Sequence, residues 1–199
     1  MRKQNSDLHG NAPDKCPVAL LLVDVINDLE FPGNAGILQS AKKMAPRLYT
    51  LTQRARKAKI PVVYVNDNFG RWRSDFNQQV EHCLREEVAG KALAEKLRPE
   101  RDDYFVLKPK HSGFYASGLD LLLRHLEART LIVTGIAGDR CVLFTANDAY
   151  LRDFKIFVPS DCVISNTPRQ NSDALNLMKR VLQADTRPSA RIRFQTLRK

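Results

Sequence analysis

Continuous apolar runs alternate along the chain with longer stretches in which apolar residues recur at helical spacing. The first run covers residues 18–24 (VALLLVD) and ends in an acidic residue. A run without polar alternation is typical of a strand buried on both faces of a parallel sheet. The stretch 37–59 follows, with helical spacing and a final basic run, ARKAK, that favours a helix C-terminus. The pattern therefore predicts a strand followed by a helix.

The same alternation continues along the rest of the chain. Further strands are predicted at 60–65, 103–107, 130–135 and 154–158, with a short last strand at 190–195. Helices are predicted at 77–98 with a break near Gly90, at 118–126, at 141–152 and over 174–183. Apolar strands that alternate with helices predict a three-layer α/β/α fold with a mostly parallel sheet.

Length and composition favour one globular domain. A chain of 199 residues is long enough for one well-buried core and short for two. Residues 1–16 are polar and lack the apolar core of a secretory signal, so we expect a flexible tail, a single domain over 17–199 and a cytoplasmic location. No stretch reaches the roughly 20 apolar residues that would span a bilayer, so no membrane partner is expected.

The charge of the chain changes this picture little. Its 32 basic and 22 acidic residues give a net charge of +10, but the basic residues are spread over the helical stretches and concentrated mainly at the two ends. No RNA-binding, zinc-finger or helix-turn-helix signature accompanies them. We therefore expect a small-molecule substrate rather than a nucleic acid as the partner.

The four cysteines are Cys16, Cys83, Cys141 and Cys162. They are far apart and form no C-x-x-C pair, so the spacing predicts neither a zinc cluster nor a disulfide scaffold. Reduced thiols in a cytosol fit this pattern best. Cys16, Cys83 and Cys162 are interpreted as structural.

Three chemically active residues follow the carboxyl ends of predicted strands. Asp24 ends the first strand, Lys108 follows the third, and the fourth runs into the turn that leads to Cys141. In parallel α/β sheets the ligand crevice lies beyond these strand ends. Each residue alone has an ordinary structural explanation, as a turn cap, a solvated strand end or a core thiol. Their coincidence at one rim of the sheet favours a shared site.

An acid, a cation and a thiol together are the components of a cysteine hydrolase. Only the thiolate is nucleophilic, and a helix N-terminus and a neighbouring lysine would both lower the pKa of Cys141. The carboxylate of Asp24 can accept the thiol proton and return it to a leaving amine.

Three sequence blocks resemble the isochorismatase-like cysteine hydrolases, which include nicotinamidases and N-carbamoylsarcosine amidohydrolase. The blocks are LLVDVINDLEF at 21–31, VLKPKHSGF at 106–114 and VTGIAGDRCV at 133–142. They resemble the family's acid motif, lysine motif and nucleophile turn, in the same order. The resemblance extends from Val18 to about Phe194.

The resemblance implies a six-stranded sheet and a catalytic triad of Asp24, Lys108 and Cys141. It also implies a cis peptide bond between Ile136 and Ala137, with the backbone N–H groups of Ala137 and Cys141 forming an oxyanion hole. The implied reaction is hydrolysis of a C–N bond in a small amide or ureido/carbamoyl compound, through a thioester on Cys141. Dimers or tetramers are implied as well.

The chain departs from nicotinamidases at their metal motif. Those relatives have Asp-x-His after the second strand, whereas this chain has Asp67, Asn68 and Phe69. Phenylalanine cannot bind a metal, and His82 alone does not complete a site, since a stable site needs three or four ligands. We therefore predict no catalytic metal and no cofactor. This favours the metal-free branches, which include amidohydrolases and vinyl-ether-cleaving isochorismatases, and Cys141 favours the former.

A polar and aromatic segment after the second strand is predicted to line the substrate pocket. The candidates are Asn66, Phe69 and Trp72, with Phe114 and Tyr115 after the lysine motif. Packing in the core is the alternative for each aromatic ring. His111 is a lesser candidate for the base that acts on Cys141, and neither Asp139 nor Arg140 has an assigned role.

Two classes of function remain open. The first is a metal-independent cysteine hydrolase, with an isochorismatase-type vinyl ether hydrolase as its variant. The second is a catalytically inert ligand-binding or assembly module of the same fold. The presence of Asp24, Lys108 and Cys141 together favours the enzyme, because buried charges are costly to retain without a use.

Overall fold

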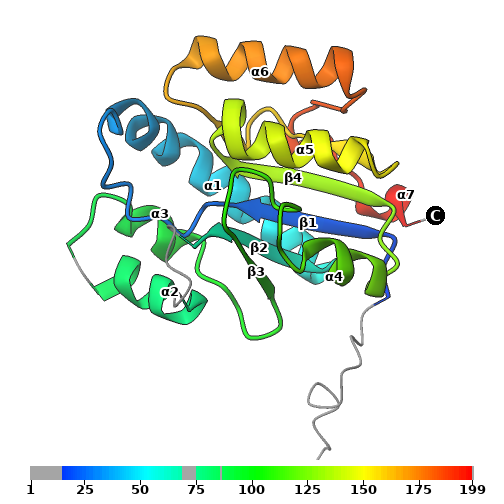
Figure 1. Ribbon diagram of the computed structural model, residues 1–199, viewed down its shortest axis with the longest axis horizontal. Helices are drawn as coiled ribbons and strands as arrows, with labels where there is room; N and C mark the ends of the chain where they lie inside the picture. Colours follow the sequence, from blue (N-terminus) through cyan, green and yellow to red (C-terminus); the bar gives the residue numbers. More distant parts are fainter. Residues whose placement is uncertain (1–14, 69–74, 86, 199) are drawn as a thin grey trace, which may run out of the picture.

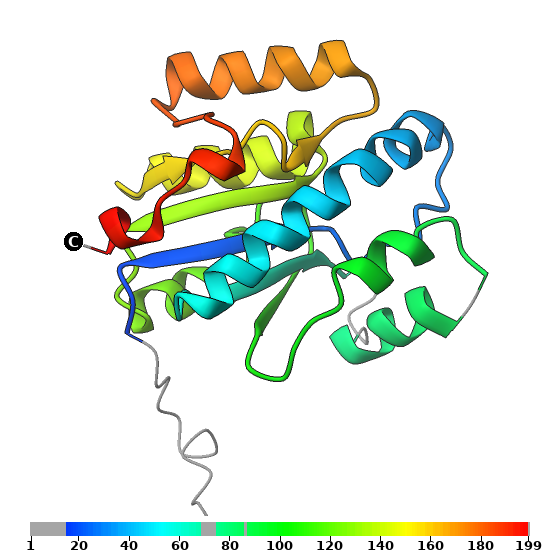
Figure 2. The same ribbon diagram turned by 180° about the vertical axis from the view of Figure 1, so that it is seen from behind.

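The computed structural model describes residues 15–68, 75–85 and 87–198, which form a sheet covered by helices on both faces (Figures 1 and 2). The strands are β1 (Val18–Val23), β2 (Val62–Asp67), β3 (Tyr104–Lys108), β4 (Thr130–Ile136), β5 (Lys155–Phe157) and β6 (Val163–Ile164). Their order is β3-β2-β1-β4-β5, with β6 also paired to β4, and every pair is parallel. The predicted three-layer α/β/α fold with a six-stranded sheet is confirmed.

Seven α-helices are present in the described residues. They are α1 (Ala35–Lys57), α2 (Phe76–Arg85), α3 (Lys91–Lys96), α4 (Leu119–His125), α5 (Leu143–Tyr150), α6 (Pro168–Val181) and α7 (Phe194–Leu197). Even-numbered residues of β1 pack with α1, α3 and α7, and odd-numbered residues pack with α4, α5 and α6. All six residues of β1 are buried, so this strand forms the centre of both cores.

The sixth strand does not lie where the sequence pattern places it. Residues 190–195 form a 3-10 turn at Ser189–Arg191 and the start of α7, and the sixth strand is β6. The alternation in Arg-Ile-Arg-Phe imitates a strand because Ile192 and Phe194 both enter the α1 core. The guanidinium of Arg54 donates to the carbonyl oxygens of Ser189 and Ile192, which supplies hydrogen bonds that a neighbouring strand would otherwise provide.

The remaining predicted elements are present with shifted ends. The break near Gly90 separates α2 from α3, as predicted. The helix predicted to include residues 174–183 begins earlier, at Pro168. There the Thr167 hydroxyl accepts the N–H of Gln170 and proline occupies the first turn. The helix predicted from Cys141 begins with a π-helical turn at Gly138–Val142, so Cys141 lies inside that turn.

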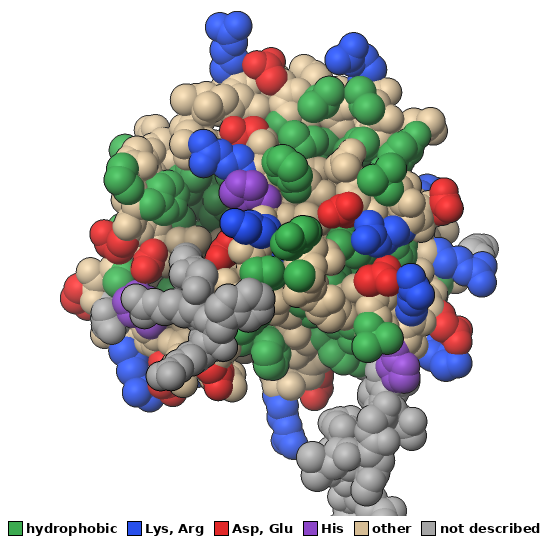
Figure 3. Space-filling model, viewed as in Figure 1, with side chains coloured by type: hydrophobic (Ala, Val, Ile, Leu, Met, Phe, Trp, Pro, Cys, Tyr) green, Lys and Arg blue, Asp and Glu red, His purple; other side chains and the backbone are tan. Residues whose placement is uncertain are grey.

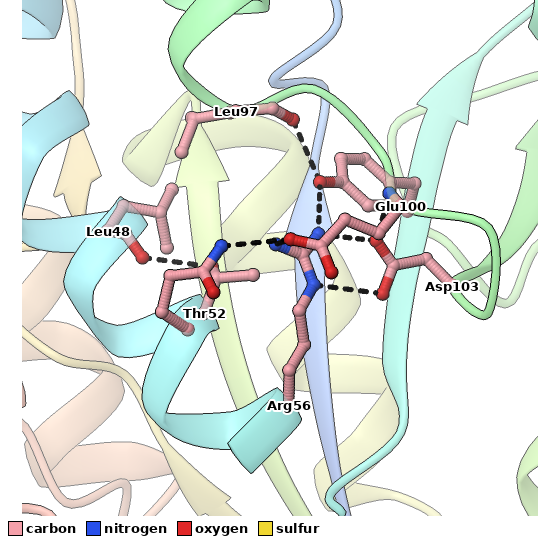
Figure 4. A network of polar contacts seen from close by, with 8 residues as sticks. Leu48, Thr52, Arg56, Leu97, Glu100 and Asp103 are labelled. Carbon is pink, nitrogen blue, oxygen red and sulfur yellow. Dashed lines mark hydrogen bonds and ion pairs between the residues drawn. The ribbon is translucent and has the colours of Figure 1, made fainter.

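A buried ion pair connects α1 to the start of β3 (Figure 4). The Arg56 guanidinium contacts both carboxylate oxygens of Asp103, and the two side chains are only 15% and 5% exposed. Arg56 also donates to Glu100 at 2.7 Å, and Tyr64 donates to the carbonyl of Leu97 at 2.8 Å. Burial is the main cause of the raised pKa of Tyr64. This network fixes the edge strand β3 against the rest of the sheet.

The chain enters the domain core at Cys16. The predicted flexible tail at 1–16 lies mostly outside the described residues, but Cys16 is buried and its N–H donates to the carbonyl of Leu126. The packed domain therefore includes Cys16, one residue earlier than the predicted boundary.

Basic, acidic and apolar side chains are interspersed on the face drawn in Figure 3. On that face the lysine and arginine side chains do not form one continuous patch. Within the described residues, none of the helices combines the length and apolar character needed to cross a membrane.

Candidate active site

The carboxylate of Asp24 lies directly beyond β1. Its backbone adopts φ +50°, a left-handed conformation that aspartate tolerates better than most residues. Its N–H donates to the Val65 carbonyl at 3.0 Å, and its Oδ1 accepts the N–H of Asp67 at 2.7 Å. These contacts hold the carboxylate between β1 and β2, where it is 5% exposed.

Lys108 joins the acid to the thiol. Lys108 is the last residue of β3 and is fully buried. Its Nζ lies 2.9 Å from Asp24 Oδ2 and 3.6 Å from Cys141 Sγ. A second carboxylate, Asp67 Oδ2, lies 3.4 Å from the same nitrogen, because Asp67 is the register partner of Lys108 in the sheet. The structure thus brings the three residues of the predicted triad into contact.

Cys141 is positioned by the turn that follows β4. The peptide bond between Ile136 and Ala137 is cis, as the resemblance implies. The Ala137 carbonyl accepts the N–H groups of Arg140 and Val142, which closes the turn around Cys141. Cys141 is partly buried, whereas Asp24 and Lys108 are buried.

The turn is also connected to the strand and helix on its far side. The N–H of Asp139 donates to the Ser165 hydroxyl, which in turn donates to Asn171 Oδ1. A Cβ at Gly138 would lie 2.5 Å from that same Asn171 oxygen, so the turn and α6 are in close contact here. Ser165 and Asn171 were not among the predicted site residues, since no spacing in the sequence relates them to Cys141. The Asp139 backbone thereby has a structural role.

Burial controls the charges of the triad. Burial, above all, raises the pKa of Asp24, with Lys108 opposing it. Burial and then the Asp24 carboxylate raise the pKa of Cys141 to about 12, although Lys108 lowers it. Burial lowers the pKa of Lys108, but its interactions with Asp24 above all, and with Cys141 and Asp67, outweigh burial and the net pKa is raised. The expected lowering of the thiol pKa is therefore wrong for the resting protein, because burial and the Asp24 carboxylate outweigh the lysine.

Comparison with known proteins relates the chain to one family. The family model described as the isochorismatase domain matches residues 18–186. The chain belongs to the isochorismatase family. The match covers all six strands and the three residues of the triad, and it ends before the 3-10 turn and α7.

Among three proteins similar to this chain, two have names that state an activity. An uncharacterized isochorismatase family protein of Bacillus subtilis, YaaI, is 42% identical over 171 residues, which are 86% of this chain and 93% of that protein. Ureidoacrylate amidohydrolase RutB of Methylorubrum extorquens is 44% identical over 70 residues, or 35% of this chain and 28% of that enzyme. The crystal structure of N-carbamoylsarcosine amidase from Thermoplasma acidophilum superposes with a TM-score of 0.70 at 28% identity, over 88% of this chain and 98% of that one.

Some residues predicted to line the pocket have other positions. Phe114 is 5% exposed and packs in the core beside Phe154, with the Arg152 guanidinium over its ring, as in the alternative that the sequence left open. Its N–H is held by the Ser112 hydroxyl, which turns the ring inward. Asn66 is fully buried and donates to the Ile26 carbonyl at 2.6 Å, so it anchors the loop after β1.

The other pocket candidates are placed as follows. Tyr115 is 57% exposed, on the surface after the lysine motif. Phe69 and Trp72 lie outside the described residues. His111, the lesser candidate for the base, has its Nδ1 atom 3.7 Å from Cys141 Sγ. Phe144, which the sequence did not indicate, packs against the His111 ring.

The possible metal ligands Asp67 and His82 contact different partners. His82 Nε2 lies 3.2 Å from Asp28 Oδ2, and Asp67 lies against Lys108. Across the ranges that the structure describes, no group of three or more His, Cys, Asp or Glu side chains is arranged to hold a metal ion.

Proposed function

We propose that this isochorismatase-family protein is a cysteine hydrolase that cleaves a C–N bond in a small amide or ureido/carbamoyl compound, without a metal or other cofactor. The observation that carries the proposal is the position of Lys108 Nζ, 2.9 Å from the Asp24 carboxylate and 3.6 Å from Cys141 Sγ. A buried acid, a buried cation and a partly buried thiol in mutual contact match the requirements of nucleophilic catalysis.

Cys141 is the proposed nucleophile and Asp24 its base. In the resting enzyme the raised pKa of the thiol keeps the proton on sulfur. The pKa of Asp24 is raised as well, so the carboxylate is a stronger base than an exposed aspartate. When the sulfur attacks the substrate carbonyl, its proton passes to Asp24, and a thioester forms as the C–N bond breaks and the leaving nitrogen takes up a proton. Water then hydrolyses the thioester.

Lys108 and the backbone of the turn are proposed to stabilise the negative charge that develops. The lysine ammonium lies beside the sulfur, where the thiolate forms. The N–H groups of Ala137 and Cys141 are the proposed donors to the oxyanion, and in other hydrolases the loss of one such donor costs about 3 kcal/mol. Both groups belong to the π-helical turn or its N-cap.

The names of the relatives support a C–N bond as the target. Ureidoacrylate amidohydrolase and N-carbamoylsarcosine amidase both have names that denote hydrolysis of amide-type bonds. We propose that the substrate of this chain belongs to the same chemical class and that the enzyme acts as a homo-oligomer. The oligomer is checked by light scattering of the purified protein.

A substrate panel with intact-mass spectrometry tests the proposal. The panel contains ureidoacrylate, N-carbamoylsarcosine, nicotinamide and isochorismate. The wild-type protein is expected to hydrolyse at least one of the C–N compounds and to carry its acyl group on Cys141 after rapid acid quenching. Cys141→Ala and Asp24→Asn are expected to lose at least ~1000-fold in kcat/KM, since each removes a group that acts in the chemical step. The control is Asp173→Asn on α6, whose side chain is 72% exposed.

Three results contradict the proposal. Full activity of Cys141→Ala would exclude the thioester. Hydrolysis of isochorismate alone, with no adduct, would favour the vinyl ether hydrolase. Absence of turnover and of any adduct across the panel would favour a ligand-binding module.

A further inference from the structure

The sulfur of Cys141 lies between two buried residues on one side and an exposed imidazole on the other. Asp24 and Lys108 are 5% and 0% exposed, whereas His111 is exposed. The Nδ1 atom of His111 lies 3.7 Å from Sγ, about as close as Lys108 Nζ at 3.6 Å. A substrate from solution must therefore reach the sulfur on the side where His111 lies.

Two sets of contacts hold His111 at the sulfur. Its ring packs against Phe144, with a centroid distance of 5.6 Å and an interplanar angle of 43°. The next two residues are attached to α5, since Ser112 donates to Asp148 and the N–H of Gly113 donates to the Thr145 hydroxyl at 2.9 Å. α5 directly continues the turn that contains Cys141. The loop of His111 and the turn of Cys141 are therefore both attached to this helix.

Asp24 is poorly placed to protonate a leaving nitrogen. Its Oδ1 accepts the Asp67 N–H and its Oδ2 contacts Lys108, so the carboxylate lies on the buried side of the sulfur, where it can exchange a proton with Sγ but does not face solvent. An amine leaves a tetrahedral carbon only when a proton reaches its nitrogen. On a carbon bonded to Sγ, a nitrogen directed toward solvent lies on the side of His111.

We propose that His111 is a second proton-transfer residue, which protonates the leaving nitrogen and then activates the hydrolytic water. The inference rests on the proposed function and divides its proton transfers between two residues. Imidazole suits this part because one ring can donate a proton and later accept one.

The steps balance as follows. The Cys141 proton passes to Asp24 as the S–C bond forms and the carbonyl becomes an oxyanion. The oxyanion collapses, the C–N bond breaks, and the nitrogen takes a proton from the His111 imidazolium. Water attacks the thioester and gives a proton to the neutral imidazole, which restores the imidazolium. The C–S bond then breaks, and Asp24 returns its proton to the departing sulfur.

Comparison of an amide with an activated ester isolates the first His111 step. The amide is whichever of N-carbamoylsarcosine, ureidoacrylate or nicotinamide the wild-type protein hydrolyses, and the ester is p-nitrophenyl acetate, whose leaving phenolate needs no proton. In His111→Gln, kcat/KM for the amide is expected to fall at least ~100-fold, the usual contribution of a general acid. The first-turnover release of p-nitrophenolate, corrected with Cys141→Ala, is expected to change less than about 3-fold because acylation by this ester needs no general acid.

His125→Gln is the matched control. His125 ends α4, next to Leu126, whose carbonyl holds Cys16 before β1, so it lies at the opposite end of the sheet from the site. Its kinetics should equal those of the wild type.

The outcomes separate the two proposals. Equal losses on amide and ester would assign His111 to structure or binding, and an unchanged amide rate would exclude it from proton transfer. Either result overturns this inference and leaves the Cys141 mechanism standing. If the wild-type protein hydrolyses none of the amides, the proposed function fails and the role of His111 fails with it.

Discussion

At the scale of single residues, the charge of Cys141 depends on burial more than on its lysine neighbour. Lys108 lies 3.6 Å from the sulfur, but burial and the Asp24 carboxylate together raise the thiol pKa to about 12. The thiol of the resting protein therefore holds its proton at neutral pH. A protonated resting thiol is also a poor target for electrophiles in solution.

The pH dependence of Cys141 alkylation tests this charge state. Iodoacetamide is added at a series of pH values up to about 11, and the modified fraction is read from intact mass, with Cys141→Ala as the background. In the wild type the rate at Cys141 should still rise at the highest pH, because its pKa of about 12 lies above the range. In Asp24→Asn the rise should shift to lower pH, since a neutral side chain replaces the carboxylate that raises the thiol pKa. A plateau below pH ~8 in the wild type would contradict the predicted resting state.

At the scale of secondary-structure elements, the close approach of β1 and β4 brings the acid and the nucleophile turn together. Gly135 is the register partner of Val23, the residue before Asp24, and it adopts φ +112°. A Cβ at Gly135 would lie 2.0 Å from the Val23 carbonyl oxygen. Only glycine fits this contact without displacing the backbone that leads to Ala137 and Cys141.

Substitution of Gly135 should therefore be costly. Gly135→Ala is expected to lower the free energy of unfolding by about 3 kcal/mol, because a backbone clash adds to an unfavourable φ. Gly118→Ala is the control, since a Cβ there meets nothing within 4 Å and its φ is −79°. That variant should change stability by less than about 1 kcal/mol. Urea denaturation followed by circular dichroism measures both, and equal stabilities would refute the close-approach argument.

At the scale of the whole molecule, the position of Lys108 depends on contacts at the other end of its strand. β3 is the last strand on one edge of the sheet, paired only with β2 on the path through the sheet. Its start is held by the ion pair of Asp103 with Arg56 of α1. The rim that holds Lys108 is thus supported by a polar network at the opposite end of β3.

Removal of Arg56 tests this support. Arg56→Met should lower the free energy of unfolding by about 3 kcal/mol, because the Asp103 carboxylate is left buried without its partner. Arg169→Met should change it by less than about 0.5 kcal/mol, because an ion pair between exposed side chains contributes little; the Arg169 and Asp173 side chains are 93% and 72% exposed. Thermal and urea unfolding of the two variants measure the difference. Equal losses in both would show that the buried pair contributes no more than a surface pair.

The local pattern alone predicts those features that depend on short stretches of sequence. The apolar runs locate β1 and β4 because strands buried on both faces have no polar positions. The break at Gly90 and the positions of Asp24 and Lys108 at strand ends can also be predicted, because each depends on a short stretch of sequence. Since the carboxyl ends of parallel strands share one rim, the order of the elements is sufficient to bring Asp24, Lys108 and Cys141 together.

The tertiary structure decided whatever depends on distant neighbours. Ile192 and Phe194 alternate like strand residues, yet the α1 core and Arg54 make them part of a turn and a helix. Phe114 became a core residue, and the Cys141 pKa rose rather than fell, because burial depends on the whole fold. The contact of His111 with the sulfur likewise requires α5 to hold both residues. Sequence by itself determined the set of chemical groups at the rim, and packing determined their exposure, their charge and which of them reach the substrate side.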